Sequence, residues 1–175
     1  IISKSIGANG DIIICLENKN DEPVYEFEVY AIFCDGDGDP VEIRSSEVYY
    51  LDPSGQIYLE FESVSLPYET YNILITKDHF LSKPINMMNN IEYKSFKEGD
   101  TIILEGTNNS DVKIEVARFQ IVFFDEKGDA LGVNTQYVFD LNRNKTFREE
   151  CNKLYDKEYN EIEYSNYKVI LEYAY

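Results

Sequence analysis

Apolar and polar residues alternate along several short stretches of this chain. Between residues 27 and 33, apolar side chains occupy every second position, while Glu26 and Glu28 fall on the other phase. A period of two places successive side chains on opposite faces of a β-strand, so one face of this strand is expected to pack inward. Residues 12–16 are apolar throughout and are followed by turn-forming residues 18–21, which is typical of a short buried strand.

The same reasoning predicts further short strands in both halves of the chain. They cover residues 47–51, 57–61 and 71–76, and then 117–123, 135–141, 145–151 and 167–173. Turn signals separate them every 8–12 residues or so, a spacing typical of β-sandwiches and barrels. The 15 Tyr and 10 Phe also favour strands.

The chain contains an internal repeat. Identical residues recur 90 positions apart: Asn18 and Asn108, Asp21 and Asp111, Phe33 and Phe123, Asp35 and Asp125, Gly38 and Gly128, Asp39 and Asp129, Val48 and Val138, Leu51 and Leu141. A constant spacing over such a span predicts two copies of one folding unit. We therefore expect an all-β protein of two tandem antiparallel β-sandwich domains, residues 1–80 and 99–175, with a linker and possible edge strand at 81–98. A residue present in only one copy is not needed for the fold.

The two copies differ in length near their ends. Tyr71 matches Tyr167 at a spacing of 96, so the second copy carries six additional residues within 152–163, which we interpret as a longer loop or a single helical turn. Ile91, Tyr93 and Phe96 are candidates for a leading strand of the second copy.

The charge of the chain limits its partners. The net charge is −17, with 16 acidic and 5 basic residues in 1–90 and 17 and 11 in 91–175. Nucleic acids and anionic membrane surfaces would be repelled by this field. No apolar stretch approaches the ~20 residues of a membrane span and no signal peptide is visible. The start at Ile1, without Met, suggests a fragment from which a leading segment was removed.

Short motifs recur in both copies. The first copy carries Gly38-Asp39-Pro40-Val41 and Leu51-Asp52-Pro53, and the second carries Val122-Phe123-Phe124-Asp125 and Gly128-Asp129. In these motifs the chain resembles FxLYD-type and related immunoglobulin-like repeats of bacterial envelope proteins. The resemblance implies an all-β fold of two tandem immunoglobulin-like antiparallel β-sandwich domains, of a kind found on secreted proteins or lipoproteins, without catalytic residues. In the first copy Cys34 replaces the aromatic residue before Asp35.

Asp35, Asp37 and Asp39 are the sharpest candidates for a metal site. Alternating carboxylates begin the Ca²⁺ shell of an EF-hand, but Pro40 stands where that loop needs Gly, and Lys127 replaces Asp37 in the second copy. We expect an acidic hairpin turn and no cofactor, with a low-affinity calcium site as the alternative.

The remaining reactive residues do not form a recognisable catalytic motif. His79 is the only His, and Cys15, Cys34 and Cys151 fit neither a zinc pattern nor a disulfide shared by both copies. A Cys15–Cys34 bridge within the first copy stays open. The surplus of Tyr predicts either a binding surface or cross-strand pairs, with these residues as candidates: Tyr49, Tyr50, Tyr58, Tyr68, Tyr155, Tyr159, Tyr164 and Tyr175.

These observations predict a non-enzymatic, extracytoplasmic spacer or interaction module that binds a surface protein or a glycan. One alternative is a carboxylate-based hydrolase or an accessory carbohydrate-binding unit, since a glycosidase needs only two suitably spaced carboxylates. Another is a purely structural stalk.

Overall fold

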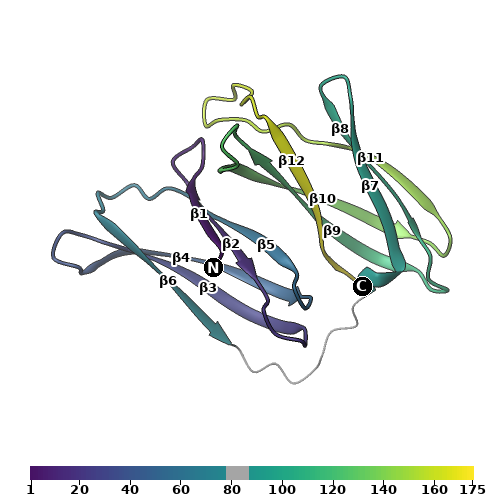
Figure 1. The fold of residues 1–175 in the computed structure, drawn as a ribbon, viewed down its shortest axis with the longest axis horizontal. Coiled ribbons are helices and arrows are strands. Elements are labelled where there is room, and N and C mark those ends of the chain that lie inside the picture. The colour runs from purple at the N-terminus through teal and green to yellow at the C-terminus, as the bar shows by residue number, and fades with distance from the viewer. Residues whose placement is uncertain (78–86) are drawn as a thin grey trace. The chain divides into compact units, whose positions relative to one another are not determined.

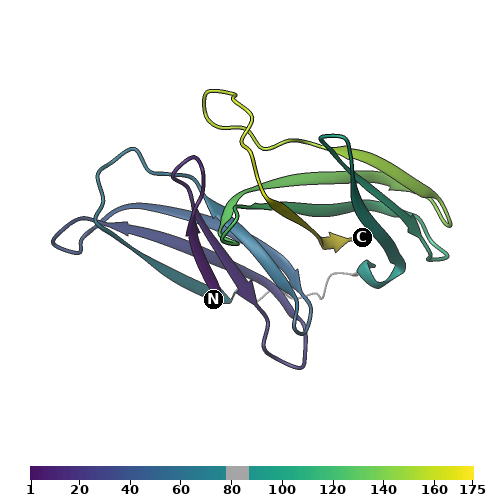
Figure 2. The same ribbon diagram turned by 45° about the horizontal axis from the view of Figure 1, so that its top comes forward.

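The computed structural model describes residues 1–77 and 87–175. The chain divides into two compact units, which we call unit 1 (Ile1–Lys83) and unit 2 (Pro84–Tyr175). Figures 1 and 2 show the strands of each unit from two sides. The described elements are antiparallel β-strands and one short 3-10 helix, so the all-β prediction is confirmed. Within the described ranges, no helix is long and apolar enough to cross a membrane.

Unit 1 contains two three-stranded sheets, with strand orders β1-β2-β5 and β4-β3-β6. Its strands are β1 (Ser3–Ile6), β2 (Ile12–Glu17), β3 (Val24–Cys34), β4 (Pro40–Leu51), β5 (Gln56–Phe61) and β6 (Thr70–Lys77). Alternate residues of β3, including Val29, Ala31 and Phe33, pack against Ile12, Ile14 and others from β2 and β5. The period of two in the sequence thus places one face of each sheet in a shared core, as in a sandwich.

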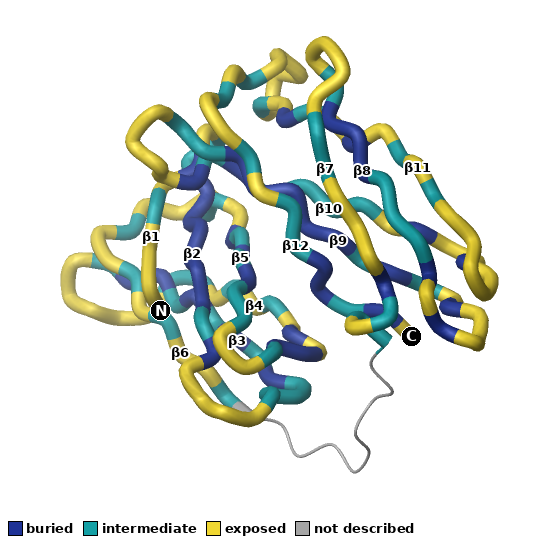
Figure 3. The backbone as a smooth tube through the Cα atoms, turned by 45° about the vertical axis from the view of Figure 1, so that its right-hand side comes forward, coloured by how far each residue is buried: buried dark blue, intermediate teal, exposed yellow. Residues whose placement is uncertain are grey.

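Unit 2 repeats this arrangement, with orders β11-β8-β7 and β10-β9-β12. Its elements are η1 (Met88–Asn90), β7 (Ile91–Glu98), β8 (Thr101–Asn108), β9 (Ile114–Phe124), β10 (Ala130–Leu141), β11 (Thr146–Cys151) and β12 (Asn166–Ala174). In Figure 3, β2 and β9 are buried over most of their length, whereas the edge strands β1, β7 and β11 are mostly intermediate or exposed.

A buried Asn explains one of the repeated positions. Asn18 donates side-chain hydrogen bonds to the carbonyls of Glu22 and Leu51 and accepts one from the Asn20 N–H. Asn108 makes the matching bonds to Val112, Leu141 and Ser110 in unit 2. One amide therefore satisfies backbone groups of two chain segments that would otherwise be buried without partners.

The two cores differ in side-chain size at one equivalent pair of positions. In unit 1, Leu16 on β2 lies opposite Ile57 on β5, and in unit 2 the same positions hold Gly106 and Phe147. A Cβ on Gly106 would lie 2.6 Å from both the Phe147 ring and the Glu92 carbonyl oxygen. The ring therefore occupies space that a side chain at position 106 would need.

Several strands differ from the sequence-based boundaries. β4 and β10 begin at Pro40 and Ala130, directly after their turns, because long stretches of mixed polarity still pair with β3 and β9. Residues 152–163 form a loop closed by a bridge between Tyr155 and Glu161, and no helical turn is present there.

Candidate functional site

The Asp35 turn has a structural use in both units. The Asp35 Oδ1 atom accepts hydrogen bonds from the N–H groups of Asp37 and Asp39, at 3.1 and 3.0 Å. Asp125 accepts the matching bonds from Lys127 and Asp129. One carboxylate in each copy is therefore engaged by the turn itself, which is what Asp does in such turns.

The calcium alternative has no further support from the side chains. Across residues 1–77 and 87–175, no group of three or more His, Cys, Asp or Glu side chains is arranged to hold a metal ion. A calcium site formed by Asp35, Asp37 and Asp39 stays a hypothesis, which thermal melts with and without Ca²⁺ would test.

The three cysteines are buried thiols and not disulfides. Burial, with a smaller effect from the Glu149 carboxylate, raises the pKa of the Cys151 thiol to about 11. A thiol with a raised pKa is a poor nucleophile at neutral pH. Cys15 lies opposite Tyr58 on β5, and the pKa of the Tyr58 hydroxyl is raised, chiefly by burial. His79 lies outside the described residues.

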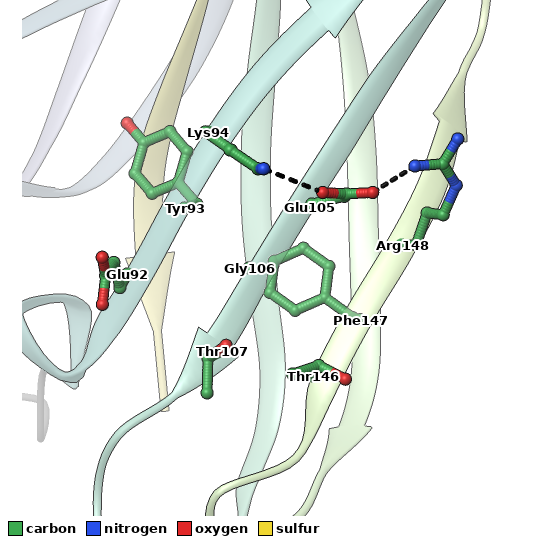
Figure 4. A pocket seen from close by; sticks show the side chains of 9 residues that line it. All are labelled: Glu92, Tyr93, Lys94, Glu105, Gly106, Thr107, Thr146, Phe147 and Arg148. Carbon is green, nitrogen blue, oxygen red and sulfur yellow. Dashed lines mark hydrogen bonds and ion pairs between the residues drawn. The ribbon is translucent and has the colours of Figure 1, made fainter.

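An open hollow of about 630 Å³ lies on the sheet β11-β8-β7 of unit 2. Figure 4 shows the Phe147 ring beside Gly106, and Glu105 between Lys94 and Arg148. Glu92, Thr107 and Thr146 also contribute to the polar part of the lining.

Lys94 and Arg148 are both paired with Glu105 in this hollow. Lys94 Nζ lies 3.3 Å from Glu105, and Arg148 contacts both Glu105 and, at 2.7 Å, Glu98. The Arg148 hydrogen bond holds the pKa of Glu105 below its usual range, and Glu98 and Glu105 raise the pKa of Arg148. A glycosidase acid requires a raised carboxyl pKa, so Glu105 is unsuited to that role.

The outer side of the sheet β10-β9-β12 in unit 2 carries a second candidate site, which we call the aromatic face. It comprises Tyr137, Phe139, Tyr173 and Tyr175 with Arg118. Tyr137 and Phe139 stack with a centroid distance of 5.7 Å, and Tyr173 and Tyr175 with 5.9 Å. The Arg118 guanidinium lies 5.9 Å from the ring centroids of Tyr137 and Tyr173, because the three residues are in register across the sheet. Phe139 and Tyr175 are more than half exposed.

A β-bulge in β12 places a buried carboxylate beside Arg118. The register shifts between Leu171 and Tyr173, so Glu172 is an inserted residue. Bulges re-aim side chains in this way. Glu172 is 4% exposed and pairs with Arg118 at 2.9 Å. Among the described residues, Glu172 Oε2 and Arg118 Nε have no hydrogen-bond partner. Burial raises the pKa of Glu172, although Arg118 and a hydrogen bond with Gln120 oppose this.

The part of unit 1 that the structure describes lacks the aromatic face. Glu28 and Glu47 take the places of Arg118 and Tyr137, and they lie opposite one another in the β3–β4 pair. Among the described residues at the matching positions only Tyr49, equivalent to Phe139, is aromatic, and it donates a hydrogen bond to Glu47. The fold of the repeat therefore does not require the aromatic face.

Seven of the eight tyrosines expected at the surface fall into two groups, and Tyr58 on β5 is half-buried. Tyr68 and Tyr164 pack edge-on against Phe33 and Phe123 at 4.9 and 4.8 Å, and Tyr50 forms a cross-strand pair with Tyr25. Tyr49, Tyr155, Tyr159 and Tyr175 are exposed. Sequence reasoning missed four of the five members of the aromatic face, namely Arg118, Tyr137, Phe139 and Tyr173. The substitutions of Glu28 by Arg118 and of Glu47 by Tyr137 between the copies were the signal that could have found it.

Comparison of the chain with protein-family models and with curated proteins gives no match.

Proposed function

We propose that the chain is a pair of immunoglobulin-like modules that acts as a non-enzymatic, extracytoplasmic interaction module. The strand orders β1-β2-β5 and β4-β3-β6, repeated in unit 2, support the immunoglobulin-like interpretation. If the strands are lettered A, B, C, C′, E and F in chain order, these sheets read A-B-E and C′-C-F, a pattern related to that of immunoglobulin domains. The resemblance to FxLYD-type repeats supports a location on the bacterial envelope.

The aromatic face is the proposed binding surface. Tyr and Arg are enriched in the residues that dominate binding energy, because they offer large rigid area with polar tips. Stacked pairs on β10 and at the end of β12 flank Arg118 on the central strand β9. The presence of this surface in unit 2, and of acidic residues at the same place in unit 1, is the observation that carries the proposal.

A surface protein is the first candidate partner, because Tyr, Phe and Arg together are the composition of a protein hot spot. A neutral glycan is the second candidate, since aromatic faces also stack on the apolar faces of sugar rings. The net charge of −17 disfavours nucleic acids and anionic glycans.

The hydrolase alternative receives less support from the described carboxylates. Glu172 is the carboxyl with a raised pKa, and its partner is Arg118 rather than a second carboxylate. Retaining and inverting glycosidases both need a pair of carboxyl groups.

The test is binding by the intact chain and by a Tyr137→Ser/Phe139→Ser variant. The probes are chitohexaose and cellohexaose for neutral glycans, and extracted envelope proteins for protein partners. The matched control is Tyr49→Ser, which removes the equivalent exposed ring from unit 1. Loss of binding in the double variant but not in the control supports the aromatic face. Equal binding by all three proteins would refute it.

A further inference from the structure

Unit 1 has an open apolar groove at one end of its sandwich. The groove measures about 210 Å³, and we call it the end groove. Its apolar lining consists of Ile1, Leu16, Val24, Phe27, Leu51 and Ile75. Ile75 is 49% exposed although it stands opposite the buried Val29 on β3, whereas the equivalent Leu171 of unit 2 is 6% exposed.

Unit 2 covers the equivalent place with its own chain. The segment from Met87 to Ile91 precedes β7, and Met87 and Met88 pack against the core of unit 2. Ile91 belongs to that core. These side chains share one core with Leu171, whose N–H also donates to the Tyr93 hydroxyl on β7 at 3.3 Å, whereas Ile75 in unit 1 is exposed.

Backbone hydrogen bonds hold this covering segment at both of its ends. The Met87 N–H donates to the Ala174 carbonyl at the end of β12, at 2.9 Å. The Asn109 N–H donates to the Asn90 carbonyl, at 2.7 Å. The segment thus bridges the two sheets of unit 2, joining β12 to the loop that follows β8.

The strand register defines where such a segment would enter unit 1. Ser3 pairs with Cys15, and Lys94 pairs with the equivalent residue Glu105. Ile1 is therefore equivalent to Glu92, and the place taken by Ile91 in unit 2 lies one residue before Ile1. Ile1 itself lines the end groove.

We propose that the end groove is the docking site of an apolar peptide segment that leads into β1, as the segment from Met87 to Ile91 leads into β7. The ligand chemistry is two adjacent, unbranched apolar side chains followed by a short polar turn. Burial of such side chains against Ile75 and Phe27 removes apolar surface from water and so stabilises unit 1.

Other occupants fit the end groove less well. Small-molecule pockets usually measure about 300–1,000 Å³, so this groove is too small for a typical ligand of that kind. A second copy of the chain would bring another net charge of −17 and be repelled. A joined segment avoids both difficulties, since its attachment to Ile1 gives it a high effective concentration at the groove.

The experiment adds five residues, Met-Met-Asn-Asn-Ile, directly before Ile1 of the full chain. The control extension is Ser-Ser-Asn-Asn-Ile, which has the same length and polar turn. We expect the Met extension to raise the melting temperature of unit 1 by roughly 4–8 °C over the control, the shift that about 1 kcal/mol of added stability produces in a domain of 60–100 residues. Nuclear Overhauser effects should join the added Met methyl groups to Ile75 and Phe27.

A groove variant, Ile75→Ser, should reduce the difference between the two extensions, because the added Met side chains then lose an apolar partner. Equal melting temperatures for both extensions in the parent chain, without those Overhauser effects, would overturn the proposal. A concentration-dependent dimer that protects Ile75 from exchange would also overturn it, because the occupant would then be a second copy.

Discussion

Replacement of Asn108 by Ala should destabilise unit 2 far more than its size suggests. The Asn108 side chain is fully buried and donates to the carbonyls of Val112 and Leu141, each at 2.9 Å. Its Oδ1 accepts from the Ser110 N–H at 2.9 Å and from the Ser110 hydroxyl at 2.6 Å. Four bonds at ~1 kcal/mol net each give a loss of about 3–4 kcal/mol, with some recovery if Ser110 reorients. A 60–100-residue domain would then melt more than ~10 °C lower.

Circular dichroism in urea and on heating measures this loss, and amide exchange in β8 and β9 assigns it to unit 2. Asn109→Ala is the matched control, because Asn109 is the exposed neighbour and its substitution should cost within ~0.5 kcal/mol. Asn18→Ala should weaken unit 1 by the same mechanism. If Asn108→Ala were as mild as Asn109→Ala, the claim that this amide holds the loop and the end of β10 together would be wrong.

Three further predictions concern the turn, the bulge and the glycine. Asp35→Ala should lower the stability of unit 1 by about 1 kcal/mol, because two N–H groups lose their acceptor, whereas Asp37→Asn should not. Thermal melts in EDTA and in millimolar Ca²⁺ test the calcium alternative in the same samples, since only a real site gives a shift in melting temperature that Asp37→Asn abolishes. Because burial raises the pKa of Glu172, the folded state binds the Glu172 proton more tightly than the unfolded state, so the contribution of Glu172 to stability falls as pH rises from the ordinary Glu value near 4.5 through the raised one. Urea unfolding from pH 4 to 7 should show a smaller loss of unfolding free energy in Glu172→Gln than in the parent chain, and an unchanged dependence on pH would contradict this reasoning. Gly106→Ala should destabilise unit 2, because its Cβ meets the Glu92 carbonyl and the Phe147 ring, and adding Phe147→Leu should recover part of the loss in thermal melts; no recovery would assign the cost to the backbone contact alone.

The repeat and the period of two were sufficient to predict an all-β chain. Phe27, Val29, Ala31 and Phe33 alternate because one face of β3 is buried, and a face of that kind leaves a clear pattern in the sequence. The early part of β4 left no such pattern, since Arg44 and Ser46 lie where neither face is fully buried.

The aromatic face was harder to predict, because its members lie on three strands far apart in sequence. Only the register that brings Tyr137 and Tyr173 beside Arg118 reveals that they form one surface. The bulge at Glu172 shifts that register by one residue, and no local motif signals it. Likewise, the high exposure of Ile75 in the end groove is recognised as unusual only by comparison with the buried Leu171.

The exchange of Leu16 and Ile57 for Gly106 and Phe147 has a consequence for folding. Two copies of one unit on a single chain can misassemble by trading equivalent strands. If β11 took the place of β5, Phe147 would meet Leu16 and crowd the core, while β5 beside β8 would leave Ile57 over Gly106 with a void. Overpacking on one side and a cavity on the other each cost stability. The difference in side-chain size thus disfavours the mispaired strands and favours pairing of each strand within its own half of the chain.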